Sequence, residues 1–322
     1  MLEVKLFGTG QAHFKDQCLA DFPGQQSSRL FCHLLLNRHY PHHREVLSTI
    51  FWGDSSTSTA RKRLRNALWR LRKQFQSLGI QLEEYLLIAD DTISFINTSA
   101  YWLDIEIFET AAESCEDLSG RQLTSTQVEN LEKAVELYRG DLLESLYEDW
   151  LLNDRERLRI LYLNALDKLL VYHGLHANYE RGLAYGEDIL TRDCTREKVH
   201  RQMMWLHALA GNRNAALTQY RRCCLILQDE LDIPPMEETQ NMYQLLLQNQ
   251  FDAKTWHADE MTPIRPAPSS DPNIHPLVRR ALQKLHHLQE TIEGTSVELQ
   301  AIEQMIHQAL VQSNQNHKNI PD

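Results

Sequence analysis

The spacing of apolar residues changes near residue 99, and this change constrains the fold more than any other feature of the sequence. Residues 2–7 and 93–96 alternate apolar and polar side chains, which is the pattern of a strand with one buried face. Between them, and through nearly all of residues 99–250, apolar side chains recur three and four positions apart, as on one face of a helix. The sequence therefore predicts a mixed domain over residues 1–98 and a helical domain over residues 99–250.

Residues that break helices divide the first domain into short elements. Pro41 ends the first predicted helix, Gly53 the second and Gly79 the third. In chain order we expect strands at 2–7 and 11–14, helices at 27–38, 43–52 and about 57–78, and strands at 80–82, 85–89 and 93–96. Three helices followed by a terminal hairpin predict a winged helix-turn-helix, an α+β fold.

A weak internal repeat runs through the second domain at an offset of 34 residues. It pairs Ala165 with Val199, Leu169 with Met203, Leu175 with Leu209, Asn178 with Asn212 and Leu183 with Leu217. This is the tetratricopeptide period, in which helix pairs stack into a curved array with a concave binding face. Helices are expected at 131–143, 154–172, 179–190, 197–210 and 214–231.

The C-terminal part has a different composition. Residues 251–276 contain five of the ten prolines and are predicted to form an extended linker. Residues 277–314 carry apolar positions at alternating spacings of four and three, a heptad pattern that predicts an amphipathic helical or coiled-coil tail. Three interpretations of this tail stay open: it dimerises, it folds back as a hairpin that caps the repeats, or it has no fixed structure.

Charge is distributed unevenly between the domains. The net charge is −11, yet residues 1–98 carry 12 Lys and Arg against 9 Asp and Glu, a balance of +3 that leaves −14 for the remainder. Seven of the thirteen residues at 61–73, within the third predicted helix, are basic and none is acidic. Such an asymmetry favours contact between this helix and a polyanion.

The third predicted helix has the side chains that reading a DNA major groove requires. Arginine can donate two hydrogen bonds to guanine, asparagine can pair with adenine, and lysine can neutralise phosphates. The predicted partner is double-stranded DNA, and the predicted contact residues are Arg61, Lys62, Arg63, Asn66, Trp69, Arg70, Arg72 and Lys73. The alternatives are a solvated basic face and, for Trp69, partial burial against the second helix or the hairpin.

At these residues the sequence resembles winged-helix activators of the SARP (antibiotic regulatory protein) type, whose N-terminal domain is similar to that of the OmpR/PhoB family. Arg70-Leu71-Arg72 matches the basic element at the end of the family's third helix. The resemblance implies that Arg70 contacts a base or an adjacent phosphate and that Arg72 contacts a phosphate. One departure is Asp91-Thr92-Ile93-Ser94-Phe95 in the hairpin, which supplies an acid and no arginine for the minor groove.

The second domain is similar to the bacterial transcriptional activator domain of the same proteins. The matching stretches are Leu137-Tyr138-Arg139-Gly140-Asp141-Leu142-Leu143, Trp150, Arg155-Glu156-Arg157-Leu158, Tyr220, and Asp229-Glu230-Leu231 with Pro234. Asp104-Ile105-Glu106-Ile107-Phe108-Glu109 resembles the join between the family's domains. The resemblance implies an activator that binds direct repeats upstream of promoters, often as a homodimer, and recruits RNA polymerase or another regulatory protein.

Catalytic and membrane functions find no support in the sequence. No H-E-x-x-H, G-x-S-x-G or G-x-G-x-x-G motif occurs, so we expect neither an enzyme nor a cofactor or metal site. No run of 18 apolar residues predicts a membrane span, and the N-terminus lacks the pattern of a secretory signal, so a cytoplasmic protein is expected.

Two other functions remain as alternatives to a DNA-binding activator. The acidic hairpin and the acidic second domain would suit a tetratricopeptide-like scaffold or adaptor with a degenerate winged helix. The repeat groove could instead hold a small anionic ligand and act as a sensor. Its candidate cations are Arg155, Arg157, Arg181, Arg213, Arg221 and Arg222.

Overall fold

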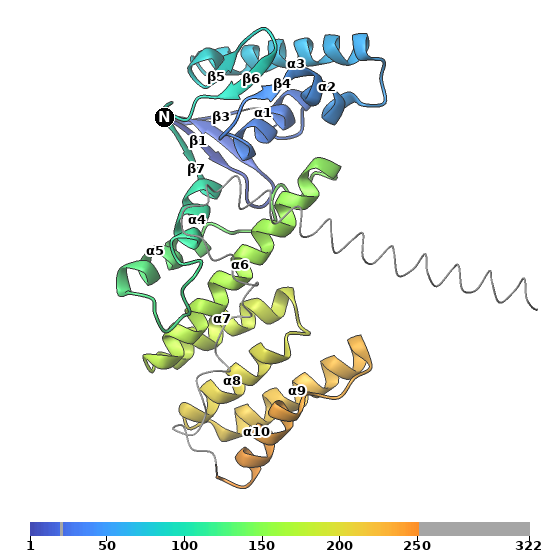
Figure 1. Cartoon of the computed structure of the whole chain (residues 1–322). Helices are drawn as coiled ribbons and strands as arrows, with labels where there is room; N and C mark the ends of the chain where they lie inside the picture. Colours follow the sequence, from blue (N-terminus) through green and yellow to red (C-terminus); the bar gives the residue numbers. More distant parts are fainter. Residues whose placement is uncertain (20–21, 251–322) are drawn as a thin grey trace, which may run out of the picture. The chain divides into compact units, whose positions relative to one another are not determined.

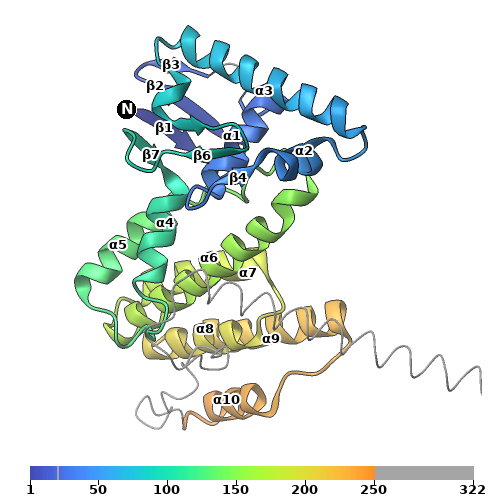
Figure 2. The ribbon, with the colours of Figure 1, turned by 45° about the horizontal axis from the view of Figure 1, so that its top comes forward.

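The computed structural model describes residues 1–19 and 22–250, so the predicted linker and tail beyond residue 250 lie outside the described part. The described chain is mainly helical, with two small sheets in its N-terminal third (Figures 1 and 2). The expected fold class, a winged helix-turn-helix followed by a helical domain, is confirmed for these residues.

The N-terminal part alternates short strands with helices. Its elements are β1 (Leu2–Lys5), β2 (Gln11–Phe14), β3 (Gln17–Cys18), α1 (Gln26–Leu36), β4 (His42–His43), α2 (Arg44–Trp52), α3 (Thr57–Ser77), the 3-10 helix η1 (Leu82–Glu84), β5 (Leu86–Ile88), β6 (Thr92–Phe95) and β7 (Tyr101–Leu103). One sheet has the strand order β3-β2-β1-β7, and the other has the order β4-β6-β5. The β5–β6 hairpin is the wing.

The first sheet extends beyond the predicted end of the first domain. In β1, Leu2 and Val4 are fully buried, as the alternating pattern predicts. Val4 lies opposite Ala12 of the antiparallel strand β2 and opposite Leu103 of the parallel strand β7. β7 follows the predicted boundary at residues 98 and 99, so a segment assigned to the helical domain completes the N-terminal sheet.

The predicted strand at 80–82 is wrong. Residues 82–84 form η1, in which the side chain of Glu84 accepts from the backbone N–H of Gln81 at 3.3 Å. Ile80 and Leu82 are buried and Gln81 between them is exposed, so the alternation is real, but it comes from a turn that enters η1 and not from a strand.

The second part of the chain consists of consecutive helices. These are α4 (Asp104–Glu113), α5 (Ser125–Val135), α6 (Asp149–Leu175), α7 (Tyr179–Arg192), α8 (Glu197–Leu209), α9 (Arg213–Leu231) and α10 (Glu237–Leu247). Helices α6 to α9 pack in chain order, each against the next, as Figures 1 and 2 show.

The 34-residue offset reports a real structural repeat. Asn178 and Asn212 occupy the same position, because they are the N-cap residues of α7 and α9. Ala165 of α6 and Val199 of α8 are likewise both buried. The helix pairs α6–α7 and α8–α9 are therefore two copies of one unit, as predicted.

The predicted helix at 131–143 is wrong at both ends. Thr124 accepts from the backbone N–H of Gln127 and starts α5 earlier than expected, and the helix ends at Val135. The backbone beyond it pairs with the end of β1, where Leu143 donates to the carbonyl of Leu6 at 2.9 Å. This segment forms hydrogen bonds with a strand more than a hundred residues earlier in the chain. The spacing of neighbouring apolar residues cannot predict such a contact.

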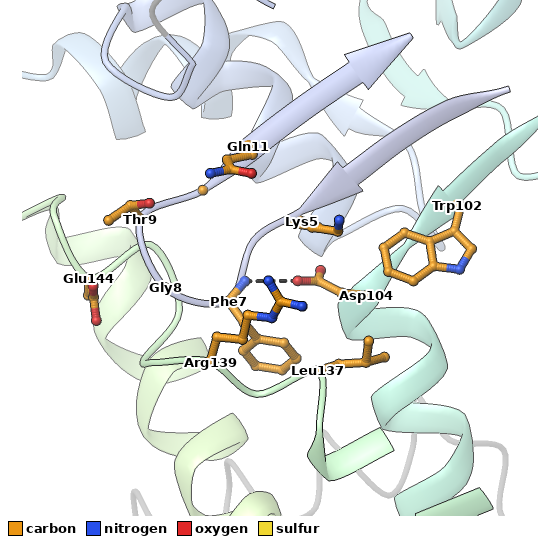
Figure 3. Close-up of a pocket in the computed structure, with 11 residues that line it drawn as sticks. Lys5, Phe7, Gly8, Thr9, Gln11, Trp102, Asp104, Leu137, Arg139 and Glu144 are labelled. Carbon is orange, nitrogen blue, oxygen red and sulfur yellow. Dashed lines mark hydrogen bonds between the residues drawn. The ribbon is translucent and has the colours of Figure 1, made fainter. Parts of the chain in front are cut away.

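Asp104 joins the sheet to the first helix of the second part (Figure 3). Its buried carboxylate accepts from the backbone N–H groups of Leu6, Phe7 and Ile105 at 2.8 to 3.0 Å. Burial raises the pKa of Asp104 to about 6, although these hydrogen bonds and Lys5 act in the opposite direction. A hollow of about 210 Å³ lies beside it, walled partly by Trp102.

Aromatic rings make a second contact between the two parts. Trp150 in the first turn of α6 packs edge-on against His33 of α1, with ring centroids 5.1 Å apart, and lies 5.5 Å from Phe51 of α2. Beside them, Arg29 of α1 pairs with Glu148. The winged helix and α6 therefore share a packed seam.

Candidate nucleic-acid interface

Helix α3 has one buried and one exposed face. Its buried residues recur three and four positions apart and pack on α1, α2 and η1. They are Ala60, Leu64, Ala67, Leu68, Leu71 and Phe75. The helix ends at Ser77, and Gly79 has a φ of +75°, the left-handed conformation that commonly follows a helix and favours glycine. The predicted apolar face and the predicted end of this helix are confirmed.

The opposite face carries a row of residues that we call the outward stripe. It consists of Lys62, Asn66, Trp69 and Lys73, which follow one another at spacings of four, three and four. At 3.6 residues per turn these spacings keep the four side chains on one line along the helix. All four are exposed.

Several polar side chains of α3 have no partner within the described part of the chain. The side chains of Lys62, Asn66 and Arg70 form no hydrogen bond or ion pair with any residue in 1–19 or 22–250. Each is exposed, so water satisfies these groups and no bond must be broken before they meet a ligand.

Three predicted contact residues have local partners on the surface. Arg61 pairs with Glu45 of α2, Arg72 with Glu83 at 2.6 Å, and Arg63 donates to the Ser55 hydroxyl at 2.9 Å. A hydrogen bond to its own backbone N–H, together with Arg72, lowers the pKa of Glu83. Exposed ion pairs contribute only about 0 to 1 kcal/mol, so Arg61 and Arg72 can exchange a carboxylate for a phosphate at small cost.

Arg65 is a candidate that the prediction omitted. It is exposed on α3, and its side chain, like that of Arg70, forms no hydrogen bond or ion pair with the described residues. Its place in the basic run was visible in the sequence. The sequence alone does not show that the folded chain leaves its guanidinium without a partner.

Trp69 is exposed and not buried against a neighbouring element. The residue keeps 57% of its accessible surface. The ammonium of Lys73 lies 5.9 Å from the centre of its ring, at the outer limit of a cation–π contact. The alternative of burial against α2 or the wing is therefore not supported.

The wing presents acid at its tip. Asp90 and Asp91 lie in the turn between β5 and β6, and both are exposed. The backbone N–H of Arg44, the first residue of α2, donates to the carbonyl oxygen of Asp91 at 2.9 Å and fixes this turn beside α2.

Comparison with known proteins places the second part of the chain in a family. Residues 103–247 match the family model of the bacterial transcriptional activator domain. The solved structure of Mycobacterium tuberculosis EmbR in complex with low affinity phosphopeptide is similar in fold, with a TM-score of 0.56. It is 21% identical in sequence, and the match covers 79% of this chain and 67% of that chain. Residues 103–247 therefore carry a bacterial transcriptional activator domain, and the chain is similar to SARP-type transcriptional regulators.

The predicted resemblance is thereby confirmed, and proteins of this type regulate transcription and are not enzymes. Comparison with curated proteins finds no match.

Most arginines in the activator domain are engaged within the fold. Arg155 donates to the carbonyls of residues 142, 143 and 146, and Arg213 donates to those of residues 246 and 247. Arg157, Arg181 and Arg222 pair with Glu109, Glu132 and Glu187, respectively. Arg221 apart, the cations proposed for an anionic ligand already have partners.

Neither a metal site nor a membrane span is found in the part of the chain that the structure describes. Residues 1–19 and 22–250 contain no group of three His, Cys, Asp or Glu side chains placed to hold a metal ion. Among the described helices, none has the length and apolar character needed to cross a membrane.

Proposed function

We propose that this chain is a transcriptional regulator that binds double-stranded DNA by placing α3 in the major groove. The observation that carries the proposal is the exposed face of α3, where Lys62, Arg65 and Arg70 have no partner among the described residues. A major groove is wide enough to admit a helix, and unpaired cations on that helix can neutralise phosphates while Asn66 reaches a base edge.

The acidic wing restricts which part of the winged helix can contact DNA. With Asp90 and Asp91 at its tip, the wing repels phosphate, so α3 and its flanks supply the binding energy. The proposal is therefore that α3 makes most of the contacts with DNA in the major groove and that the wing makes few contacts in the minor groove.

Selection of bound fragments from a random DNA library at two salt concentrations tests the proposal. The expected result is one shared motif whose affinity falls steeply as salt rises, because phosphate contacts release counterions. Absence of enrichment at both salt concentrations would contradict DNA binding and favour the adaptor function.

The activator domain is proposed to contact RNA polymerase or another regulatory protein, and the regulator to bind its site as a homodimer. The family match of residues 103–247 supports an activating role. Transcription in vitro from a template that carries the selected site should rise when the regulator is added. A fall in transcript would instead indicate a repressor. The mass of the DNA complex, measured by sedimentation, should correspond to two chains bound to one duplex.

A further inference from the structure

An exposed tryptophan in the middle of a basic helix face is unusual. Trp69 is 57% exposed, and no other large apolar side chain of α3 is exposed. Exposing so much apolar surface is unfavourable in water, and the helix packs without it, because its neighbours Leu68 and Leu71 already fill the buried face. The fold gives Trp69 no packing role that would explain its presence.

Trp69 lies at the centre of the surface proposed to enter the groove. On the outward stripe it follows Asn66 by three residues and precedes Lys73 by four. Arg65 and Arg70 lie on either side of it, and neither has a partner within the described chain. When these cations hold phosphates on both walls of a groove, the indole ring is directed at the base edges between them.

The charged residues around Trp69 favour a polyanionic ligand over an apolar protein surface. A protein partner that binds through an exposed aromatic side chain usually meets an apolar patch from which charges are depleted. Here the nearest side chains on α3 are cations and an amide, which complement a polyanion. The one apolar group that a polyanionic duplex displays in its major groove is the 5-methyl group of thymine.

We propose that Trp69 contacts the 5-methyl group of a thymine and so sets the base preference at the centre of the recognition helix. This inference rests on the proposed function, because it requires α3 to lie in the major groove. It adds a base identity: the bound site carries thymine where the middle of α3 meets the duplex.

Replacing thymine by uracil removes the methyl group and leaves the hydrogen-bonding edge unchanged. In the site obtained by selection, each thymine is replaced by uracil in turn, and the dissociation constant of the full chain is measured at one salt concentration. We expect one position in each half-site at which uracil weakens binding about fourfold, the effect of losing one buried methyl group.

Variants of Trp69 link that position to the side chain. Trp69→Ala should bind the thymine and uracil sites equally, and Trp69→Phe should keep part of the preference. The matched control is Gln76→Ala, an exposed change on the same helix, which should keep the full fourfold ratio. Helical circular dichroism of each variant shows that the fold is kept.

The outcomes separate this inference from the proposed function. Salt-dependent binding to a shared motif, with no uracil effect at any position, would overturn the role of Trp69 and leave DNA binding intact. The same holds if Trp69→Ala keeps the wild-type ratio of thymine to uracil affinity. Failure of the full chain to bind any DNA would overturn both.

Discussion

The basic residues of the two domains differ in what their charged groups contact. On α3, Lys62, Arg65 and Arg70 have no partner within the described chain. In the activator domain, Arg155 is held by three backbone carbonyls and Arg222 by the carboxylate of Glu187. The first group is open to a ligand, Arg155 stabilises the fold, and the exposed ion pair of Arg222 contributes little. A basic residue therefore indicates an anion site most clearly when the folded chain leaves it unpaired.

Removing cations from the two domains should give opposite results in DNA binding. The double change Lys62→Ala and Arg70→Ala should weaken binding to the selected site by at least a hundredfold, because it removes one phosphate contact and one base or phosphate contact. Fluorescence anisotropy with labelled duplex measures this loss. The control Arg222→Ala should bind like the wild type; equal losses in both variants would break the distinction between the domains.

The free energy of unfolding should show the reverse pattern: removing an arginine from the activator domain should matter more than removing one from α3. Arg155→Ala leaves three carbonyl groups near residues 142–146 without their donor and should lower the free energy of unfolding by about 3 kcal/mol. Arg70→Ala should change it by less than about 0.5 kcal/mol, because the side chain is exposed and unpaired. Urea unfolding followed by circular dichroism provides both values. A small effect at Arg155 would contradict its structural role.

The seam between the domains should make stability depend on pH. Burial, with a smaller contribution from His42, lowers the pKa of His33 to about 4. In the unfolded chain His33 therefore takes up a proton near pH 6.5, whereas in the folded chain it stays neutral down to about pH 4. His33 therefore lowers the free energy of unfolding as pH falls from about 6.5 to 4.

His33→Phe removes this group and keeps an aromatic ring against Trp150. Relative to the variant, the wild type should lose about 2 kcal/mol between pH 7.5 and pH 4.5. Urea unfolding at the two pH values measures the difference, and the exposed His43→Phe serves as the control. A difference that does not vary with pH would show that His33 is not buried as a neutral ring.

The wing should have the smallest effect, with the opposite sign to α3. Asp91→Asn removes an exposed acid from the hairpin turn and should strengthen DNA binding about threefold at low salt, through weaker repulsion of phosphate. The gain should shrink as salt is added. Unchanged affinity at all salt concentrations would place the wing away from the duplex.

Local patterns in the sequence predict α3 well because its structure is determined locally. The spacing of Leu64, Leu68 and Leu71 identifies the buried face, and Gly79 identifies the end. The repeat offset identifies the helix pairs for the same reason, since each copy has its own apolar face and an asparagine at the N-cap position of its second helix.

Long-range contacts explain what the sequence does not predict. The segment after α5 reads as helix, but Leu143 bonds to Leu6 across the chain, and β7 pairs with β1 beyond the predicted boundary. Contacts formed only in the folded chain also distinguish the arginines. Arg155 and Arg65 look alike in the sequence, and the partners that distinguish them become visible only when the chain is folded.

The salt dependence of DNA binding tests most directly whether the unpaired cations of α3 are the contact surface. The logarithm of the binding constant is measured against the logarithm of salt concentration for the wild type, for Lys62→Gln with Arg65→Gln, and for Arg213→Gln with Arg222→Gln. We predict that the α3 variant loses about 0.9 of slope for each phosphate contact removed, whereas the activator-domain variant keeps the wild-type slope. Equal slopes in all three proteins, or a loss confined to the activator-domain variant, would contradict the account.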